Sequence, residues 1–574
     1  MKKRLCSVTA AALAFCLALA GCGGGGQSSA GTSSKEESSS ASQTSSQVST
    51  SETEGGKMSA AGELPIVAEP VEINLAIEKS GQVEDYVDNS FTKYIEERTG
   101  LKLNLEIYPG AEANQKMEVL IASGAELPDA FSGGNFFGSS KQLTVYRHAQ
   151  NGTFIQLDEL LDQYGVNIKN MAAQAQNKDL MELIKSPDGH VYALPQYHEQ
   201  TSNEHSLRAY INQAWLDALK LEKPTTTEEL YQVLKDFREQ DPNGNGQADE
   251  IGMMGGGNWH QMAADWMMNS FIYDDGELRW NVSGGTLDVP YNKEQWREGL
   301  RYLNRLCSEG LFDPLTFTQD GPAFKSVATA GDRNTIGVIC TAGMGQLFTT
   351  SMTDRKAEYT PLDPMVGPEG VQYAAYYPTV PSPIMAITKD CKEPEIMFRL
   401  ADFFFDQEAT LFSRFGEPGV DWVEPDPEGV ALGDAYGADC EIKAILVWGG
   451  SSHKSHWSNV TPNIMLRKWM DGQQWNGDPT DAEYMIAQST ATLIDKSPEE
   501  ACTLIIYDPD EADQIADIKT SLETYVKESM ARFATGDMNV DSDWDAYVKE
   551  LDNIGLQTYM EVSQKAFDRM NGKG

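Results

Sequence analysis

Between residues 71 and 131 the hydrophobic period switches repeatedly between a strand-like and a helix-like repeat, and this switching constrains the fold more than any other feature of the chain. The pattern predicts strands at 71–77, 101–107 and 127–131, with helices at 91–98 and 115–123 between them. This order is typical of an open α/β sheet whose strands are mostly parallel. Ligands bind such sheets beyond the carboxyl ends of the strands, so the loops 80–89 and 132–137 are candidates for a binding cleft.

Two further stretches predict that the chain passes between two lobes of this kind. Extended segments at 191–195 and 207–211 bracket the polar residues 196–206, which we interpret as a crossing. The segment 378–388 contains three prolines and ends as a strand, which fits a return crossing. Helical patterns are predicted at 226–237, 296–306 and 393–415 and at two places in the tail, with apolar faces formed by Ile515, Ile518, Leu522, Tyr525 and Val526 and by Trp544, Tyr547, Val548 and Leu551.

The first residues indicate export. Lys2, Lys3 and Arg4 precede a short apolar core, and Leu19 to Cys22 resembles a bacterial lipobox. We therefore expect residues 1–21 to be a signal peptide that is removed and Cys22 to carry lipid, with palmitate among its acyl chains. An uncleaved anchor or an ordinary signal peptide is the alternative. In each case the protein works outside the cytoplasm, and lipidation would hold it at the extracellular face of the cell membrane.

Composition agrees with an exported protein. Residues 22–64 are rich in Gly, Ser, Thr, Gln and Glu, which predicts a flexible linker. The net charge of -41 argues against nucleic acid as a partner and against a basic membrane-docking patch. The cysteines beyond residue 22 have neither a disulfide nor a zinc spacing, and we expect them to be mostly buried small hydrophobes: Cys307, Cys340, Cys391, Cys440 and Cys502.

The stretch from Asp241 to Gly252 has the spacing of a calcium loop. A hard cation needs about six to eight oxygen ligands. Gly246 stands where such a loop turns sharply, and oxygen-bearing side chains stand at the first, third, fifth and ninth positions, namely Asp241, Asn243, Asn245 and Asp249. The EF-hand pattern ends in a Glu at position twelve, where this chain has Gly252, so Glu250 would have to substitute. A surface turn without metal is the alternative, because the same residues are strong turn formers.

Taken in order along the chain, several motifs resemble the extracellular solute-binding lipoproteins of bacterial ABC sugar importers. The resemblance is to the large calcium-containing group that includes the alginate-binding proteins, and it covers nearly the whole mature chain. It rests on the lipobox, the calcium loop and the runs Ala122–Asp129, Asp188–Pro195, Trp296–Pro314 and Trp544–Val548.

This resemblance implies an α/β, two-lobed periplasmic-binding-protein-like fold with a hinge and a central ligand cleft. Such a protein, expected to be a monomer, closes on an oligosaccharide and delivers it to an ABC permease. We expect the first lobe to comprise residues 65–195 and 378–450, and the second 196–377 and 451–574. The calcium would be structural and lie in one lobe away from the ligand, bound by Asp241, Asn243, Asn245, the Gln247 carbonyl, Asp249 and Glu250.

Aromatic residues in loops are the candidates for ligand contact. Sugar rings have apolar faces ringed by hydroxyls, so their sites combine flat aromatic side chains with a few polar groups. The candidates are Trp259, His260, Trp266, Tyr376, Tyr377, Trp448 and Trp457. Each of them could instead belong to the core. Trp448 and Trp457 are favoured because their surroundings do not resemble a helix or strand interior, whereas Trp296 and Trp544 lie on amphipathic helix faces and are predicted to be core.

The sequence motifs give less support to an enzymatic function. Ser451 to Lys454 matches the Ser-x-x-Lys of penicillin-recognising enzymes but lacks the partner motifs of that class. His198-Glu199 lacks the second His of a metalloprotease. Paired carboxylates for glycoside hydrolysis could be present, although nothing singles out a pair. The leading hypothesis is therefore a non-catalytic oligosaccharide receptor. One alternative is a secreted hydrolase or lyase. Another is a receptor of the same fold that binds peptides or another solute, or one that signals to a sensor instead of a permease.

Overall fold

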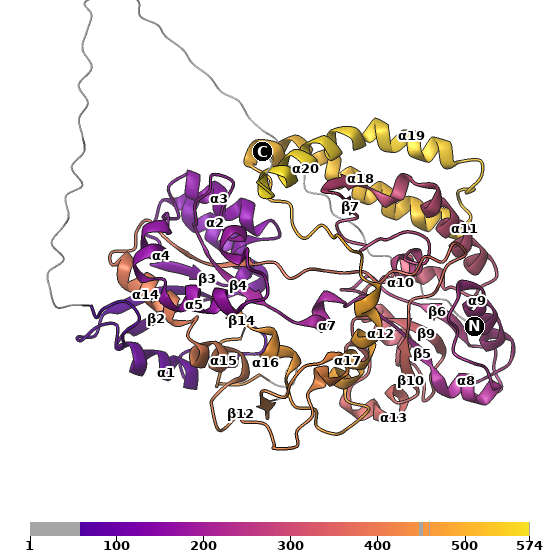
Figure 1. The fold of residues 1–574 in the computed structure, drawn as a ribbon, viewed down its shortest axis with the longest axis horizontal. Helices are drawn as coiled ribbons and strands as arrows, with labels where there is room; N and C mark the ends of the chain where they lie inside the picture. The colour runs from indigo at the N-terminus through magenta and orange to yellow at the C-terminus, as the bar shows by residue number, and fades with distance from the viewer. Residues whose placement is uncertain (1–57, 447–451, 459, 573–574) are drawn as a thin grey trace, which may run out of the picture. The chain divides into compact units, whose positions relative to one another are not determined.

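The computed structural model describes residues 58–446, 452–458 and 460–572 (Figure 1). The predicted signal peptide, Cys22, nearly all of the predicted linker, Trp448 and Ser451 lie outside these residues. In the described parts of the chain, no helix combines the length and apolar character that crossing a membrane requires.

The first of two larger sheets has six strands in the order β14-β4-β11-β3-β1-β2. β1 pairs in parallel with β2 and β3, β14 pairs in parallel with β4, and β11 runs antiparallel to its neighbours β3 and β4. The carboxyl ends of all the strands except β11 therefore meet at one edge. The strands are β1 Glu72–Lys79, β2 Lys102–Pro109, β3 Ala130–Ser132, β4 Leu194–His198, β11 Ser382–Ile387 and β14 Asn463–Met465.

Capping residues fix the ends of the helices that cover this sheet. The Asn89 side chain accepts a hydrogen bond from the backbone of Phe91 at the start of α1, and Gly100 ends that helix with a φ of 77°. The alternation predicted for residues 71–131 is confirmed, whereas the helical stretch predicted at 393–415 is two helices, because Asp406 caps a new one. The helices are α1 Ser90–Thr99, α2 Ala113–Ser123, α3 Lys141–Gln150, α4 Asp158–Tyr164, α5 Val166–Gln174, α6 Leu180–Leu183, α14 Pro394–Phe403, α15 Gln407–Phe415 and α16 Arg467–Asp471.

The second sheet has four strands in the order β10-β5-β9-β6. β6 is parallel to β9, and β5 is antiparallel to both β9 and β10, so the carboxyl ends of β6, β9 and β10 share an edge with the start of β5. The strands are β5 Ala209–Asn212, β6 Ile251–Met254, β9 Ile336–Cys340 and β10 Tyr359–Leu362. A short hairpin pairs β7 Asn281–Ser283 with β8 Thr286–Asp288, and a separate antiparallel pair joins β12 Trp422–Val423 to β13 Lys443–Ala444.

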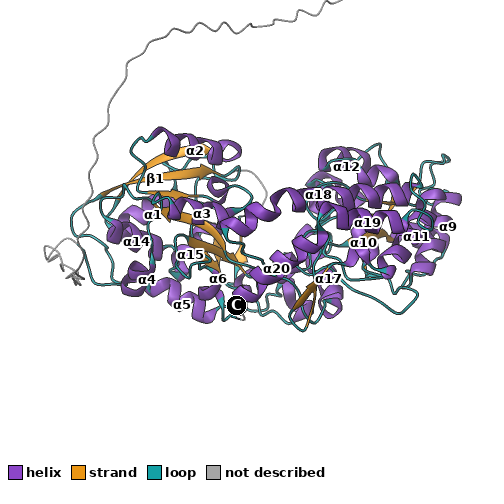
Figure 2. Ribbon diagram, turned by 90° about the horizontal axis from the view of Figure 1, so that it is seen from above, coloured by secondary structure: helices purple, strands orange, loops and turns teal. Residues whose placement is uncertain are grey.

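The capping box predicted for the helix after Thr226 is present in α9, and the predicted apolar face of that helix is buried. Figure 2 shows α18 and α19 beside α10 and α11, and the helices of the tail pack on one another and on α11. The helices of this lobe are α8 Gln213–Leu219, α9 Thr227–Glu239, α10 Ala263–Met268, α11 Glu294–Ser308, α12 Gly321–Ala328, α13 Thr353–Lys356, α17 Ala482–Leu493, α18 Pro509–Thr535, α19 Trp544–Ile554 and α20 Leu556–Met570.

Each sheet has its own hydrophobic core, so the molecule consists of two α/β lobes. The chain crosses between them three times: from β4 to β5 through the short helix α7 (Thr201–Glu204), from β10 to β11, and from α16 to α17. The first two crossings connect the carboxyl edge of one sheet to that of the other. Residues 463–465, which the sequence placed in the second lobe, form a strand of the first sheet.

Candidate functional site

A polar cluster lies at the carboxyl edge of the first sheet. Glu78, near the end of β1, accepts hydrogen bonds from the backbone N and the Nδ2 of Asn135, at 2.8 and 2.6 Å. Lys141 Nζ donates to Ser382 Oγ at 3.1 Å, at the start of β11. Burial raises the pKa of Glu78 and lowers the pKa of Lys141. The cluster therefore presents desolvated polar groups where ligands bind sheets of this type.

Glycines make room for this cluster. Gly133 has a φ of 140°, and a Cβ there would lie 2.3 Å from Glu78 Cβ. A Cβ on Gly134 would lie 2.7 Å from Lys141 Nζ. The loop 132–137 was predicted to belong to a cleft, but no local pattern indicated that Glu78 and Lys141 meet beside it. The glycine pair within that loop is the signal that could have indicated a close approach.

The carboxyl edge of the second sheet carries two connected loops. In the loop after β6, Gln261 Nε2 donates to Gln346 Oε1 at 3.1 Å, and Thr341, after β9, donates its hydroxyl to the same oxygen at 3.0 Å. Gly256 N also donates to the Gln261 carbonyl at 3.0 Å, which folds residues 256–261 into a tight turn. The turn projects Trp259, whose side chain is 49% exposed.

Three of the predicted ligand residues come together at this edge. The ring centroids of Trp259 and His260 are 4.3 Å apart, and those of His260 and Tyr377 are also 4.3 Å apart, both edge to face. Tyr377 donates its hydroxyl to the Asp275 carbonyl at 2.6 Å, and Tyr376 lies against the ring of His205 at 5.2 Å. Burial lowers the pKa of His260 to about 3, so its imidazole is neutral at physiological pH.

A pocket of about 350 Å³ adjoins these aromatic residues. Arg279 donates to Asp265 at 2.6 Å and also to Asp274, so its charge is neutralised within the protein. Burial raises the pKa of Glu277, whose Oε1 lies 3.7 Å from His260 Nε2. The pocket therefore combines an exposed indole with a few polar groups, including Glu277, Arg279 and Lys527.

Two predicted ligand residues prove to be core. Trp457 is fully buried, with its ring centroid 5.8 Å from those of Tyr86 and Phe91, and its Nε1 donates to Thr92 at 2.8 Å. Trp266, in α10, is buried in the core of the second lobe. Neither indole has a face free for a sugar ring. Trp448 lies outside the described residues.

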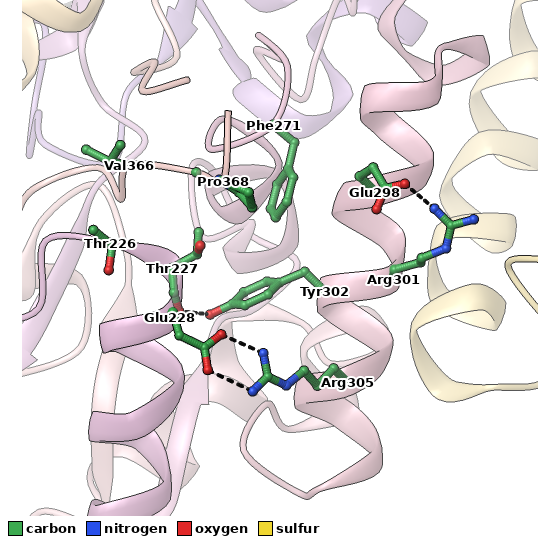
Figure 3. A pocket seen from close by; sticks show the side chains of 11 residues that line it. Thr226, Thr227, Glu228, Phe271, Glu298, Arg301, Tyr302, Arg305, Val366 and Pro368 are labelled. Atoms are coloured by element: carbon green, nitrogen blue, oxygen red, sulfur yellow. Dashed lines mark hydrogen bonds and ion pairs between the residues drawn. The ribbon is translucent and has the colours of Figure 1, made fainter. Parts of the chain in front are cut away.

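A second pocket, of about 500 Å³, lies between the start of α9 and α11 (Figure 3). Arg305 pairs with both oxygens of Glu228 at 2.7 and 3.0 Å, and Tyr302 donates to the Thr227 carbonyl. Arg301 pairs with Glu298 and with Asp541. Both arginines of this pocket are thus neutralised by carboxylates, so they offer no free charge to an anionic ligand.

The residues of the enzymatic alternatives have structural partners. His198 is hydrogen-bonded to Asn463 at 2.7 Å. Glu199 accepts from the backbone of Gln176 at 2.6 Å and from that of Arg467 at 3.2 Å. Lys454 forms an exposed ion pair with Asp88 at 3.4 Å.

The predicted calcium loop follows α9 directly. The Asp241 carboxylate accepts from Asn245 N at 3.1 Å and from Gly246 N at 3.0 Å, and Gly246 turns with a φ of 74°. Asn243 and Asn245 donate their amides to Asp249 Oδ1, each at 3.1 Å. The oxygen-bearing side chains of the loop therefore converge.

Glu250 is the exception within this loop. It is only 1% exposed, and neither oxygen of its carboxylate has a hydrogen-bond partner. Burial raises its pKa. A buried carboxylate without a partner is costly, and a cation would remove that cost, so the donor set fits a hard cation. Among the described residues no three His, Cys, Asp or Glu form a metal-binding group, so such a cation would also need amide and carbonyl oxygens.

Two lobes joined by crossings at their carboxyl edges, with a site at those edges, define a binding protein that closes on a solute. Residues 80–410 match the family of bacterial extracellular solute-binding proteins, and the chain belongs to that family. The predicted fold class is thereby confirmed, and the family is one of binding proteins rather than enzymes.

Relatives with assigned roles are similar over most of the chain. The fructooligosaccharide ABC transporter substrate-binding protein FusA of Streptococcus pneumoniae is 25% identical over 495 residues, which are 83% of this chain and 86% of FusA. Lipoprotein LipO of Bacillus subtilis is 25% identical over 57% of this chain and 62% of LipO.

Solved structures show the same fold. The FusA EF-hand mutant in complex with fructo-nystose has a TM-score of 0.70 at 22% identity, covering 88% of this chain and all of that one. Alginate-binding protein AlgQ2 without calcium has a TM-score of 0.59 at 20% identity, covering 88% of this chain and 99% of that one.

Proposed function

We propose that this protein captures a neutral oligosaccharide between the carboxyl edges of its two sheets and delivers it to an ABC permease. The observation that carries the proposal is the exposed Trp259 beside the neutral His260 and Tyr377, at the edge where such sheets bind ligands. The fructooligosaccharide specificity in the name of FusA supports the substrate class.

The charges around the site favour a neutral ligand. Arg279 in the pocket is already paired with Asp265 and Asp274, and Glu277 adds a carboxylate. The protein as a whole carries a charge of -41, which repels a polyanion. In this site the aromatic faces would contact the sugar rings, and the polar cluster around Glu78 and Lys141 would contact hydroxyl groups.

A binding screen tests this proposal. We expect one or more members of a panel of neutral oligosaccharides, with kestose and nystose included, to raise the melting temperature and to remain intact by chromatography. Shortening of the sugar would support the hydrolase or lyase alternative instead. Stabilisation by peptides alone would favour a receptor of the same fold for peptides.

The loop 241–250 is proposed to bind a structural calcium ion. The ligands would be Asp241, Asn243, Asn245, the Gln247 carbonyl, Asp249 and Glu250. The proposal is supported by the partnerless carboxylate of Glu250 and by the EF-hand named for the FusA structure. Arg238 at the end of α9 donates to the Glu250 carbonyl at 2.8 Å, so the ion would stabilise the join between helix and loop.

The direction in which one substitution changes the melting temperature distinguishes a metal site from a turn without metal. With calcium present, Glu250→Gln should lower the melting temperature, because a charged ligand is lost. After chelation the same substitution should raise it, because a buried unpaired charge is removed. Glu239→Gln, at an exposed position of α9, serves as the control. A Glu250→Gln variant that is stabilised with and without calcium would refute the site.

Anchoring at the extracellular face of the membrane through Cys22 is also proposed. The lipobox supports it, as does similarity to a protein named as a lipoprotein. In cells fed labelled palmitate, Cys22→Ala should lose the label and leave the membrane fraction. A variant that stays in that fraction without label would indicate an uncleaved signal anchor.

The lobe limits are proposed from membership of the sheets and cores. The first lobe would comprise the described residues within 65–198 and 382–471, and the second those within 209–362 and 482–572, with the crossings between them. We further propose that the protein is a monomer, which light scattering coupled to size-exclusion chromatography tests.

A further inference from the structure

A single buried acidic residue links the first two crossings to α16, the helix from which the third crossing starts. Glu204, at the end of α7 in the first crossing, is 6% exposed. Both oxygens of its carboxylate accept from Arg467 Nη2, at 2.8 and 2.9 Å. Arg467 begins α16, which leads into the third crossing. One ion pair therefore joins the first crossing to the helix from which the third crossing starts.

The second crossing is attached to the same residue at two points. Thr379 donates its hydroxyl to Glu204 Oε1 at 2.9 Å, and the backbone N of Tyr377 donates to the Glu204 carbonyl at 2.8 Å. Tyr377 is the residue whose ring contacts His260 at the candidate ligand site. Glu204 thus connects the ligand-site aromatic residues of the second crossing to the first crossing and to α16.

Neighbouring contacts hold α7 against α16. Asp471 accepts from the backbone N of Thr201 at 3.2 Å and from its hydroxyl at 2.5 Å, and Arg467 also donates to that hydroxyl. His205 donates Nδ1–H to the Thr201 carbonyl, so its Nε2 accepts from Ser497 Oγ at 2.8 Å. Because these groups are largely removed from water, losing one partner leaves another unpaired.

We infer that Glu204 is a positioning residue, which through Thr379, Tyr377 and Arg467 holds the first two crossings and the helix before the third in one arrangement and so sets the separation of the lobes before ligand arrives. The inference rests on the proposed function, since lobe closure is what makes that arrangement matter. Breaking the junction should free the crossings without disrupting either hydrophobic core.

Hydrogen exchange and small-angle X-ray scattering on the unliganded protein test the inference. In Glu204→Gln we expect exchange in residues 201–205 and 376–379 to accelerate by about tenfold or more. We also expect a broader distribution of interatomic distances. Glu511→Gln is the matched control, because Arg569 pairs with both oxygens of Glu511 at 2.7 and 2.8 Å within the second lobe alone.

Thr379→Val removes one of the two links between Glu204 and the second crossing, the hydroxyl bond, and keeps the shape of the side chain. It should accelerate exchange at 376–379 and leave 201–205 unchanged, even if Glu204→Gln does not fold. Unchanged exchange and scattering in the folded variants would overturn the inference. Because no sugar is present, failure of the oligosaccharide screen would not affect this result, and a positive screen would not rescue it.

Discussion

The carboxyl edges of the two sheets occupy corresponding places in the two lobes but differ in chemistry. The edge of the first sheet presents the half-buried Glu78 and Lys141 together with the exposed Asn135. The edge of the second sheet presents the rings of Trp259 and Tyr377. A search for aromatic residues in loops finds only the second of these edges, although a sugar requires both stacking and hydrogen bonding.

The polar edge should be the more sensitive to added volume. In Gly133→Ala the new Cβ would clash with Glu78, and the backbone conformation at a φ of 140° is strained for alanine. We expect a loss of about 2 to 4 kcal/mol in the free energy of unfolding, measured with urea. Gly152→Ala, with a φ of 71° and open space around the Cβ, should cost only about 1 kcal/mol. Equal losses in the two variants would show that the approach to Glu78 is not tight.

Substitution at the aromatic edge should change the affinity for oligosaccharide more than the free energy of unfolding. Trp259→Ala should weaken binding of the best oligosaccharide in the panel about tenfold or more by calorimetry, because an exposed stacking face is lost. Its free energy of unfolding should change by about 0.5 kcal/mol or less. Trp457→Ala should instead lose about 3 to 5 kcal/mol of stability, because its ring is fully buried. Unaltered affinity in Trp259→Ala would remove this residue from the site.

The two edges should also differ in their response to pH. Burial raises the pKa of Glu78, so the folded state binds this proton more tightly than the unfolded chain does. The stability contributed by this group is therefore present at low pH and is lost as pH rises through its folded pKa. Relative to Glu78→Gln, wild type should gain stability as pH falls from 7 towards 4, by an expected effect of about 1 kcal/mol or less. Glu106→Gln, on exposed β2, is the control, and parallel curves would contradict the burial of Glu78.

The smallest expected effect is at His260. Its folded pKa of about 3 lies below the ordinary histidine value, so it contributes stability that is present above pH 6.5 and is lost as pH falls towards 3. Between pH 5 and 8 the imidazole should therefore remain neutral in the folded protein, whereas in the unfolded chain it titrates around pH 6.5. The His260 proton signal in NMR, assigned by its absence in His260→Gln, should not shift between pH 5 and 8. A midpoint near 6.5 would mean that the ring is open to water.

The local sequence pattern predicted the helices and strands well, but it did not predict the contacts between residues that lie far apart in the sequence. The strands and helices between residues 71 and 131 follow from periodicity and caps, and the α9 capping box follows from Thr226 and Glu229. Trp457 was misassigned because its flanking Gly and Ser residues resemble an open loop. What buries it is the ring of Phe91 and the hydroxyl of Thr92, which lie some 365 residues away in the sequence. No local signal reports such a contact.

The same limit applies to the polar edge and to the junction of the crossings. Glu78 meets Asn135 across 57 positions, and Glu204 meets Arg467 across 263. The spacing within the loop after α9 predicted converging oxygens because all its members lie in one short segment, and the loop shows that convergence. Sequence reasoning therefore succeeds where a site is local and fails where the fold assembles it.

The repeated crossing of the chain has a consequence for biogenesis. The first sheet is incomplete until β14, so the N-terminal lobe requires a strand that is synthesised after most of the second lobe. Neither lobe is a continuous piece of the gene, and the order of synthesis does not match the order of assembly. The early segments of a chain of this design therefore depend on late ones for a finished core.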